Sequence, residues 1–307
     1  MSTQVLVTGA TGNVGSAVVR ALLAKGMAVR AAGSDLARLR TLLGPQVAVE
    51  QLDFYRPSTF ATALMGCDRL FLMRPPAISQ VRRTLLPFID TARALGVRQV
   101  VFLSVQGADK NPLIPHHAVE RHLQAGPPQW TLLRPGFFAQ NLGDAYRRDL
   151  TERGRLYVPA GAGRVAFIDV RDLAEVAALA LYDPSAHHGA AYTLTGPSAL
   201  GFAEVAQLLS HKLARPIRYQ PASLLGYLLH LRRQGVPLSQ AIVLTILHFG
   251  LRLGQAATVD NTLQRLLGHP GRTLGNYVDD HVGLFEAVAT TPSPNLNHAV
   301  SSDEPLP

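Results

Sequence analysis

The sequence predicts an α/β fold in which a doubly wound parallel sheet is joined to a smaller, mostly helical C-terminal lobe. Three observations lead to this fold class. A glycine-rich turn connects a strand pattern to a helix pattern near the start of the chain, strand and helix patterns alternate through the first half, and the last third is leucine-rich. Such alternation is typical of a parallel sheet covered by helices on both faces.

The glycine-rich turn lies within Val5 to Gly15, where an apolar strand meets glycines at positions 9, 12 and 15. Glycine lets the backbone turn tightly and lets a diphosphate approach it, and the following helix offers free N–H groups and its positive dipole end. This spacing between a strand and a helix is the Rossmann-type dinucleotide fingerprint, and an ordinary glycine-rich turn is the alternative. The expected cradle consists of Gly9, Thr11, Gly12, Asn13, Val14 and Gly15.

Each element of the first half follows from its side-chain pattern. Short apolar runs between turn residues predict strands at 5–8, 28–32, 48–52, 69–73, 99–104 and 130–134. Apolar residues that recur every three or four positions predict helices at 15–25, 36–43, 57–65, 78–95 and 117–124. Ligands of such a sheet gather at the carboxyl ends of its strands.

The second half is less regular. Strands are predicted at 164–168, 191–195 and 217–220, and helices at 170–181, 202–213 and through most of 223–285. The first of these helices begins beside Asp169 and Asp172, which we interpret as caps. We expect a dinucleotide-binding Rossmann domain at 1–155, a substrate lobe interleaved with it at 156–289, and a disordered Pro-, Ser- and Asn-rich tail at 290–307.

Composition limits the function classes. The chain has 307 residues, of which 47% are hydrophobic, enough for a large core. Its one cysteine, Cys67, excludes a disulfide framework and a cysteine-based metal site, and we expect no metal. The N-terminus enters a strand directly, and the longest apolar run, 241–253, is too short and too polar to span a bilayer. We therefore expect a cytoplasmic protein without a membrane partner.

The net charge of +8 allows attraction to nucleic acid or to an anionic surface. However, the arginines are scattered, and no basic block or recognition-helix pattern occurs. We expect no nucleic-acid partner. The leucine-rich helices at 223–231 and 238–253 are expected to pack the lobe, and they can also wall an apolar pocket or bury the interface of a homodimer.

Four segments carry a resemblance to a known family. They are 7–15, 101–108 followed by Ile114-Pro115-His116-His117 and Glu120, 131–141 with the sequence Thr-Leu-Leu-Arg-Pro-Gly-Phe-Phe-Ala-Gln-Asn, and 165–174. Together they resemble the NmrA-like branch of the atypical short-chain dehydrogenase/reductase superfamily, which includes quinone, azo-dye and triphenylmethane reductases. The resemblance covers nearly the whole chain, and the segment 131–141 is more specific than the glycine turn.

The resemblance implies contacts at the ends of the strands. Those with the cofactor would come from Asp53, Phe54, Met73, Arg74, Pro75, Ser104, Pro135, Gly136 and Phe137. Those with the substrate would come from Gln106, Phe137, Phe138 and Asn141. Ser104 stands where the superfamily has its catalytic serine, so its hydroxyl is expected to donate to a substrate carbonyl or the nicotinamide amide. Each of these residues also has a structural alternative. Asp53 can cap a helix, the Ser104 hydroxyl can bond its own loop, and Phe137 and Phe138 can belong to the core.

Two departures from the superfamily pattern bear on the chemistry. No tyrosine has a lysine four residues later, so the usual phenolic acid is missing. Many relatives have an arginine just after the second strand, which can hold the 2′-phosphate of NADP, but this position is Ser34 here. Asp35 is interpreted as a helix cap, and Arg38 can reach a phosphate. We slightly favour NADP(H) and leave NAD(H) open.

His116 and His117 are the proton donors that the motif-bearing segments offer. A histidine with a pKa of ~6.5 can supply a proton at neutral pH. Alternatively, the two histidines are only the solvated start of a helix, and solvent delivers the proton.

We expect an NAD(P)H-dependent reductase that transfers a hydride to an apolar, aromatic acceptor such as a quinone, enone, imine or azo compound, including a tailoring step on an aromatic metabolite. The alternative is a non-catalytic redox-sensing regulator that binds NAD(P).

Overall fold

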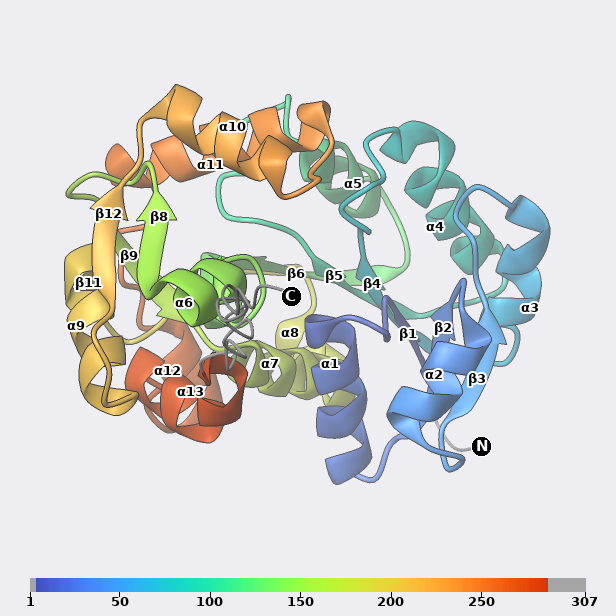
Figure 1. Ribbon diagram of the computed structural model, residues 1–307. Helices are drawn as coiled ribbons and strands as arrows, with labels where there is room; N and C mark the ends of the chain where they lie inside the picture. The colour runs from blue at the N-terminus through green and yellow to red at the C-terminus, as the bar shows by residue number, and fades with distance from the viewer. Residues whose placement is uncertain (1–3, 287–307) are drawn as a thin grey trace, which may run out of the picture.

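The computed structural model of the protein describes residues 4–286. Its centre is a seven-stranded sheet in the order β10-β6-β5-β4-β1-β2-β3, with every neighbouring pair parallel (Figure 1). The strands are β1 Gln4–Thr8, β2 Ala28–Gly33, β3 Ala48–Gln51, β4 Arg69–Met73, β5 Gln99–Leu103, β6 Gln129–Pro135 and β10 Ala190–Leu194. This confirms the predicted α/β fold with a doubly wound parallel sheet.

Helices cover both faces of the sheet because alternate strand residues point to opposite sides. In β1, Val5 and Val7 enter a core shared with α1 Asn13–Ala24, α2 Leu36–Leu43, α7 Val170–Tyr182 and α12 Thr262–Leu267. Leu6, between them, enters a second core. This core is shared with α3 Phe60–Leu64, α4 Leu85–Ala94, α5 Pro115–Gln124 and the single turn η2 Val81–Arg83. The turn η1 Pro57–Thr59 precedes α3 and has no buried residue.

The C-terminal lobe has a third core of its own, built around two small sheets and several helices. One sheet joins β11 Ala199–Gly201, β9 Arg164–Ile168 and β7 Phe137–Phe138, and the other joins β12 Arg218–Pro221 and β8 Arg155–Val158. The helices are α6 Arg147–Arg153, α9 Phe202–Lys212, α10 Leu224–Arg233, α11 Leu238–Arg252 and α13 Leu274–Asp280, with turns η3 Ala139–Asn141 and η4 Val282–Phe285.

The region 156–286 contributes to both parts of the molecule. β10 pairs with β6 at the edge of the main sheet, and α7 packs against α1, while α8 Pro184–His187 connects the two. The lobe and the dinucleotide-binding part therefore interleave, and the division at residue 155 stays a prediction. The proposed tail at 290–307 lies outside the described residues.

Candidate active site

The loop after β1 has the shape of a diphosphate cradle, and its glycines have different reasons to be glycine. Gly9 has a φ of +66°, in the left-handed region that favours glycine, and a side chain there would strike Met73 Sδ. Gly15 lies in the first turn of α1, where an added Cβ would run into the backbone of Gly9 and Ala10. The close packing of α1 on the loop therefore depends on Gly15.

Gly12 faces open space instead. It is exposed, its N–H donates to the Gly9 carbonyl at 3.0 Å, and it precedes α1 as an N-cap without a side-chain bond. A Cβ added at Gly12 would meet only Gly9 O, at an ordinary 3.5 Å. The first N–H groups of α1 thus remain open to an anion, flanked by Thr11 and Asn13, and the loop fits a dinucleotide diphosphate. The side chain of Val14 is buried in the core, so only its backbone N–H can belong to the predicted cradle.

A carboxylate from the lobe lies at the entrance of this cradle. Asn13 Nδ2 donates to Asp144 Oδ2 at 2.6 Å, and both side chains are exposed. Asp144 follows η3, so the bond connects the cradle to the lobe across 131 positions of sequence. No sequence pattern pointed to Asp144, because a hydrogen bond over such a separation leaves no local signal.

The end of β2 is where an adenosine ribose would lie in a Rossmann fold. Ser34 is exposed directly after β2, and Asp35 caps α2 by accepting the Arg38 N–H at 2.9 Å, as predicted. The exposed Arg38 guanidinium forms no ion pair within residues 4–286. An unpaired cation therefore stands one helical turn from Ser34.

The structure corrects the prediction for Phe54. Its side chain is buried in the second core, edge-on to Phe88 with ring centroids 5.2 Å apart, so it is a packing residue rather than a wall of an adenine site. Asp53 accepts the Tyr55 N–H at 2.9 Å and holds the turn before η1. Asp53 thus stabilises its own turn, whereas η1 begins after Arg56 without a side-chain cap.

A cavity of about 460 Å³ opens at the carboxyl ends of β5 and β6, beneath α11. It brings together most of the predicted residues of this region: Arg74, Ser104, Gln106, His116, Pro135, Gly136, Phe137, Phe138 and Asn141. Its other walls are Leu244, Leu247 and Leu251 of α11. His117, Met73 and Pro75 do not line it. Aliphatic and aromatic side chains thus surround a few polar groups, as in sites for apolar ligands.

Ser104 is held by a buried ion pair. Its hydroxyl donates to Glu120, and Arg134 clamps the same carboxylate through Nε at 2.9 Å and Nη2 at 2.6 Å. Ser104 and Glu120 are 1% and 2% exposed. Because the serine proton is used for Glu120, the oxygen is left to accept a hydrogen bond, which reverses the predicted direction. Glu120 and Arg134 both lie in the family motifs, but the sequence pattern alone predicts no role for either residue.

His116 is 7% exposed and meets Arg74, whose Nε donates to His116 Nε2 at 3.3 Å. Burial, together with the positive charge of Arg74, lowers the pKa of His116 to about 3. The ring is neutral at physiological pH, so the structure corrects the prediction that it delivers a proton as an imidazolium. Arg74 also donates to the carbonyls of Pro75 and Pro76, so its own loop occupies the guanidinium that was expected near a phosphate.

His117 also has a structural contact. Its Nδ1 lies 2.7 Å from the carbonyl oxygen of Ala108, and the ring is half-buried outside the cavity. This bond fixes the loop after β5 to the start of α5. The predicted role of His117 in proton transfer has no support from this geometry.

The cavity contains a hydrogen-bonded pair that the sequence did not reveal. The Tyr146 hydroxyl lies 2.6 Å from His248 Nε2, and His248 Nδ1 lies 2.7 Å from the Leu244 carbonyl oxygen. A carbonyl only accepts, so Nδ1 carries the proton and Tyr146 donates to Nε2. Burial raises the pKa of Tyr146 well above its usual range and lowers that of His248. Both groups are therefore neutral near pH ~7.

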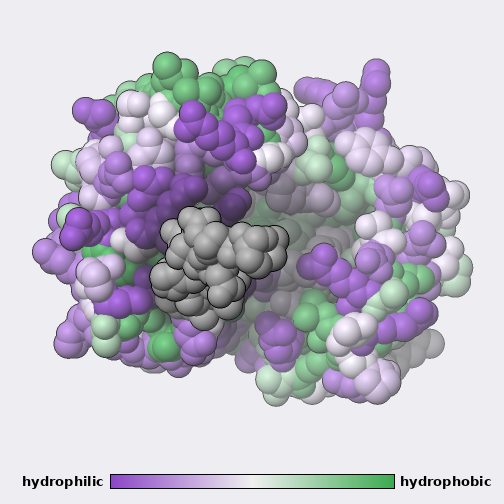
Figure 2. Space-filling view, viewed as in Figure 1, coloured by the Kyte–Doolittle hydropathy of each residue, from purple (hydrophilic) through white to green (hydrophobic). Residues whose placement is uncertain are grey.

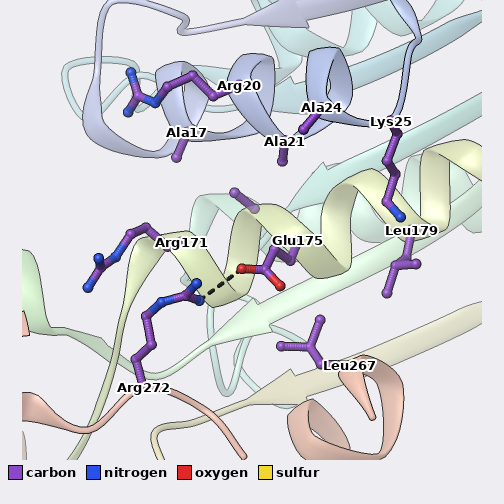
Figure 3. Close-up of a pocket in the computed structure, with 11 residues that line it drawn as sticks. Ala17, Arg20, Ala21, Ala24, Lys25, Arg171, Glu175, Leu179, Leu267 and Arg272 are labelled. Atoms are coloured by element: carbon purple, nitrogen blue, oxygen red, sulfur yellow. Dashed lines mark hydrogen bonds and ion pairs between the residues drawn. The ribbon is translucent and has the colours of Figure 1, made fainter. Parts of the chain in front are cut away.

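A second cavity, of about 570 Å³, lies between α1 and α7 (Figure 3). Its floor is formed by small residues such as Ala17 and Ala21. At its rim Arg272 bonds Glu175 at 2.9 Å and also donates to the buried Asp172. Asp172 thus anchors Arg272, whereas Asp169 is the cap of α7. This cavity is away from the carboxyl ends of the strands, so we do not assign the chemistry to it.

The sequence of this chain is similar to those of known proteins. Residues 1–261 match the model of the NmrA-like family. The chain is 35% identical over 287 residues to the NAD(P)H azoreductase of Xenophilus azovorans, which covers 92% of this chain and 99% of the relative.

Two solved structures are also similar to this chain. The triphenylmethane reductase of Citrobacter sp., complexed with NADP(H), superposes with a TM-score of 0.81 at 26% identity, covering 90% of this chain and 99% of the other. The NADPH-dependent quinone oxidoreductase of Escherichia coli, complexed with NADPH, gives a TM-score of 0.80 at 27% identity, with 91% and 99% covered.

Proposed function

The chain belongs to the NmrA-like family, and we propose that it reduces an apolar, aromatic acceptor with NAD(P)H. It is an NAD(P)H-dependent oxidoreductase, as similar enzymes are. The observation that carries the choice of acceptor is the cavity at the ends of β5 and β6, which adjoins the fold's dinucleotide edge and is walled by Phe137, Phe138 and the leucines of α11.

The residues of the cradle fit the cofactor. The open N–H groups at the start of α1, those of Asn13 and Val14, would hold the diphosphate, and Ser34 with Arg38 would face the adenosine ribose. We infer a preference for NADP(H), with NAD(H) also accepted, because the unpaired Arg38 can meet a 2′-phosphate. Bound NAD(P)H supplies a hydride from its nicotinamide ring.

Ser104 is proposed as a positioning residue for this cofactor. Its proton is committed to Glu120, so its oxygen would accept from the carboxamide N–H of the nicotinamide. The Arg134–Glu120 ion pair keeps that orientation, because an unpaired buried carboxylate would be costly. The role of the pair is thus to aim Ser104 into the cavity rather than to exchange protons.

The acceptor would lie against Phe137, whose ring meets His248 edge-on at 6.0 Å. Flat aromatic acceptors suit such a wall, since offset contact between rings is favourable. Quinones, enones, imines and azo compounds delocalise the charge that a hydride brings, so they need little help from an acid. Each turnover adds one hydride and one proton to the acceptor.

The proton is proposed to come from solvent. Tyr146, His248 and His116 all stay uncharged near neutrality, because burial opposes the ionised form of each. The Tyr146 hydroxyl, whose proton is committed to His248, holds the His248 ring edge-on to Phe137. Positioning of the reactants then supplies most of the rate.

We place the protein in the cytoplasm, where the reduced cofactor is available and the buried Cys67 thiol stays reduced. No nucleic-acid partner is proposed, and a homodimer stays a prediction. The apolar cavity favours an enzyme over the regulatory alternative, which needs a dinucleotide site but no substrate space.

Oxidation of NADPH and NADH, followed with a water-soluble quinone, an azo dye, an enone and an imine, tests this function. We expect turnover with at least one acceptor and loss of it in Gly12→Val. Calorimetric binding of NADPH without turnover on any of the four would instead support the regulatory alternative.

A further inference from the structure

The α10–α11 hairpin carries an apolar face that is not covered by any other part of residues 4–286. Eight side chains on it are 42–66% exposed: Leu224, Leu225, Leu229, Leu238, Ile242, Val243, Ile246 and Leu247. Figure 2 shows this face, here called the hairpin face, as the hydrophobic surface at the top of the view, where α10 and α11 lie in Figure 1. Contiguous exposed apolar residues commonly mark an interaction site.

Helix α11 is apolar on both of its sides. Ala241 and Leu251 turn inward and are 0% and 4% exposed, whereas Ile246 turns outward and is 64% exposed. A helix that is hydrophobic all round is normally buried on all sides. The outward side of α11 therefore has the chemistry of a buried surface without a protein neighbour in the described chain.

The charged residues on the α10–α11 hairpin itself are all basic. Between Glu204 and Asp260 the sequence contains no acidic residue. The basic residues of this stretch are Lys212, Arg215, Arg218, Arg232, Arg233 and Arg252. Arg232 and Arg233 end α10 and Arg252 ends α11, all three exposed and without an ion pair among residues 4–286. Cations thus stand at both ends of an apolar platform.

We propose that the hairpin face docks on an anionic phospholipid surface. Leucine and isoleucine side chains would enter the interface, and the arginines would meet lipid phosphates, as in amphipathic surface-bound helices. A second copy of the chain fits less well, because a two-fold interface would bring the same arginines together around the same face. The apolar area and the positive ends together favour lipid phosphate over a like-charged partner.

From the sequence we expected no membrane partner, because the longest apolar run is too short and too polar to span a bilayer. Among residues 4–286 no helix is long and apolar enough to cross a membrane. Docking on the surface makes no such demand, because the hairpin needs only to lay one side against the lipid.

The hairpin face runs directly into the mouth of the cavity. Leu247 is 59% exposed on that face and also lines the cavity at the ends of β5 and β6. An apolar acceptor dissolved in the lipid would then reach the cavity without crossing water. This last step rests on the proposed function, whereas the docking itself does not.

Co-sedimentation with vesicles tests the docking without any measurement of activity. The full chain is mixed with vesicles of phosphatidylcholine alone or with about one third phosphatidylglycerol, at low and high salt. The variants are Ile246→Glu on the hairpin face, Arg233→Gln at its end, and Met65→Glu as a control. Ile246 and Met65 are both 64% exposed, so the control introduces the same charge at an equally exposed apolar position away from the hairpin face.

We expect the wild type and Met65→Glu to sediment with the anionic vesicles and not with phosphatidylcholine alone. Ile246→Glu should lose about tenfold or more in partitioning, and Arg233→Gln about fivefold, with high salt weakening both wild type and control. Circular dichroism checks that each variant is folded. NADPH oxidation with a water-soluble quinone should be unchanged in Ile246→Glu, which separates this proposal from the function.

Two results would overturn docking on lipid. One is wild-type protein that stays in solution with both kinds of vesicle. The other is a wild-type dimer in light scattering that becomes a monomer in Ile246→Glu, because the hairpin face would then be an interface between copies.

Discussion

Asp144 and Asn13 meet at 2.6 Å across the entrance of the diphosphate cradle, so a carboxylate of the lobe stands beside an anion site. The amide of Asn13 screens this charge only in part. Like charges about 4 Å apart repel by about 1 kcal/mol even in water. We therefore expect the Asp144 carboxylate to weaken the binding of a dinucleotide diphosphate while it joins the lobe to the cradle.

Removing the Asp144 charge should strengthen cofactor binding. We expect Asp144→Asn to lower the calorimetric Kd for NADPH by about five- to tenfold at low salt, and less at high salt, because screening weakens the repulsion. Glu152→Gln, which neutralises an exposed carboxylate of α6, is the control and should have no effect. Unchanged affinity in Asp144→Asn would mean that the diphosphate lies elsewhere.

The glycines of the cradle should fail in different ways. Gly12→Val should remain folded, since its Cβ meets only an ordinary contact, but should lose dinucleotide binding because the side chain enters the anion space. Gly15→Val should lose stability by about 3 kcal/mol or more, because its Cβ collides with the backbone of Gly9. Thermal unfolding and calorimetry separate the two effects. Equal cofactor affinity in wild type and Gly12→Val would refute the cradle.

Ser34 should control cofactor preference. A guanidinium at this exposed position can pair with a 2′-phosphate together with Arg38, so Ser34→Arg should raise the NADPH-to-NADH ratio of kcat/KM by about tenfold. Thr41→Arg, on α2 about one turn beyond Arg38, serves as the comparison. If both variants change the ratio equally, the effect comes from net charge and Ser34 does not face the ribose.

His116 should make stability depend on pH. Its folded pKa of about 3 lies below the value of ~6.5 expected in the unfolded chain, so the unfolded state binds the extra proton between these values. The stability from neutral His116 is complete above ~6.5 and is lost as the pH falls, by up to ~1.4 kcal/mol per pH unit. Urea unfolding of wild type and His116→Phe at pH ~7 and ~5 should show a smaller acid loss in the variant. Parallel losses would place the titration elsewhere.

Tyr146 should affect binding of the acceptor more than proton supply. Tyr146→Phe removes the hydroxyl that donates to His248 and so positions the ring that meets Phe137, and we expect KM for a quinone to rise by about fivefold while kcat changes less. The profile of kcat against pH should keep its shape, because the phenol does not ionise near neutrality. A loss of ~10²-fold in kcat with a lost titration would instead identify Tyr146 as the acid.

The sequence predicts a helix or strand well where a few neighbouring residues determine it. The strand at 69–73 and the helix at 36–43 have the predicted bounds, since an apolar run and an Asp35 cap define them within a few residues. β7 has two residues and β11 three, too short for any periodicity to appear. Their pairing with β9 is decided by the packing of the lobe.

The site was predictable where it belongs to one motif. The glycine loop and Phe137 lie where the motifs placed them, because each follows a strand of the sheet. Tyr146 and His248 are 102 positions apart and meet only when α11 folds over the sheet, so no spacing could reveal them. The low pKa of His116 likewise results from burial beside Arg74, and the sequence alone does not show that these two residues meet.

The late return of β10 to the sheet has a consequence for how the protein is made. β6 pairs with β5 on one side and with Ala190–Leu194 on the other, after the chain has already left to form β7, β8 and β9. During synthesis the edge of β6 therefore stays unpaired until residue 194 has emerged from the ribosome. An unpaired edge invites other strands, so a fragment ending at residue 155 should aggregate rather than fold, and the two parts of the molecule mature together.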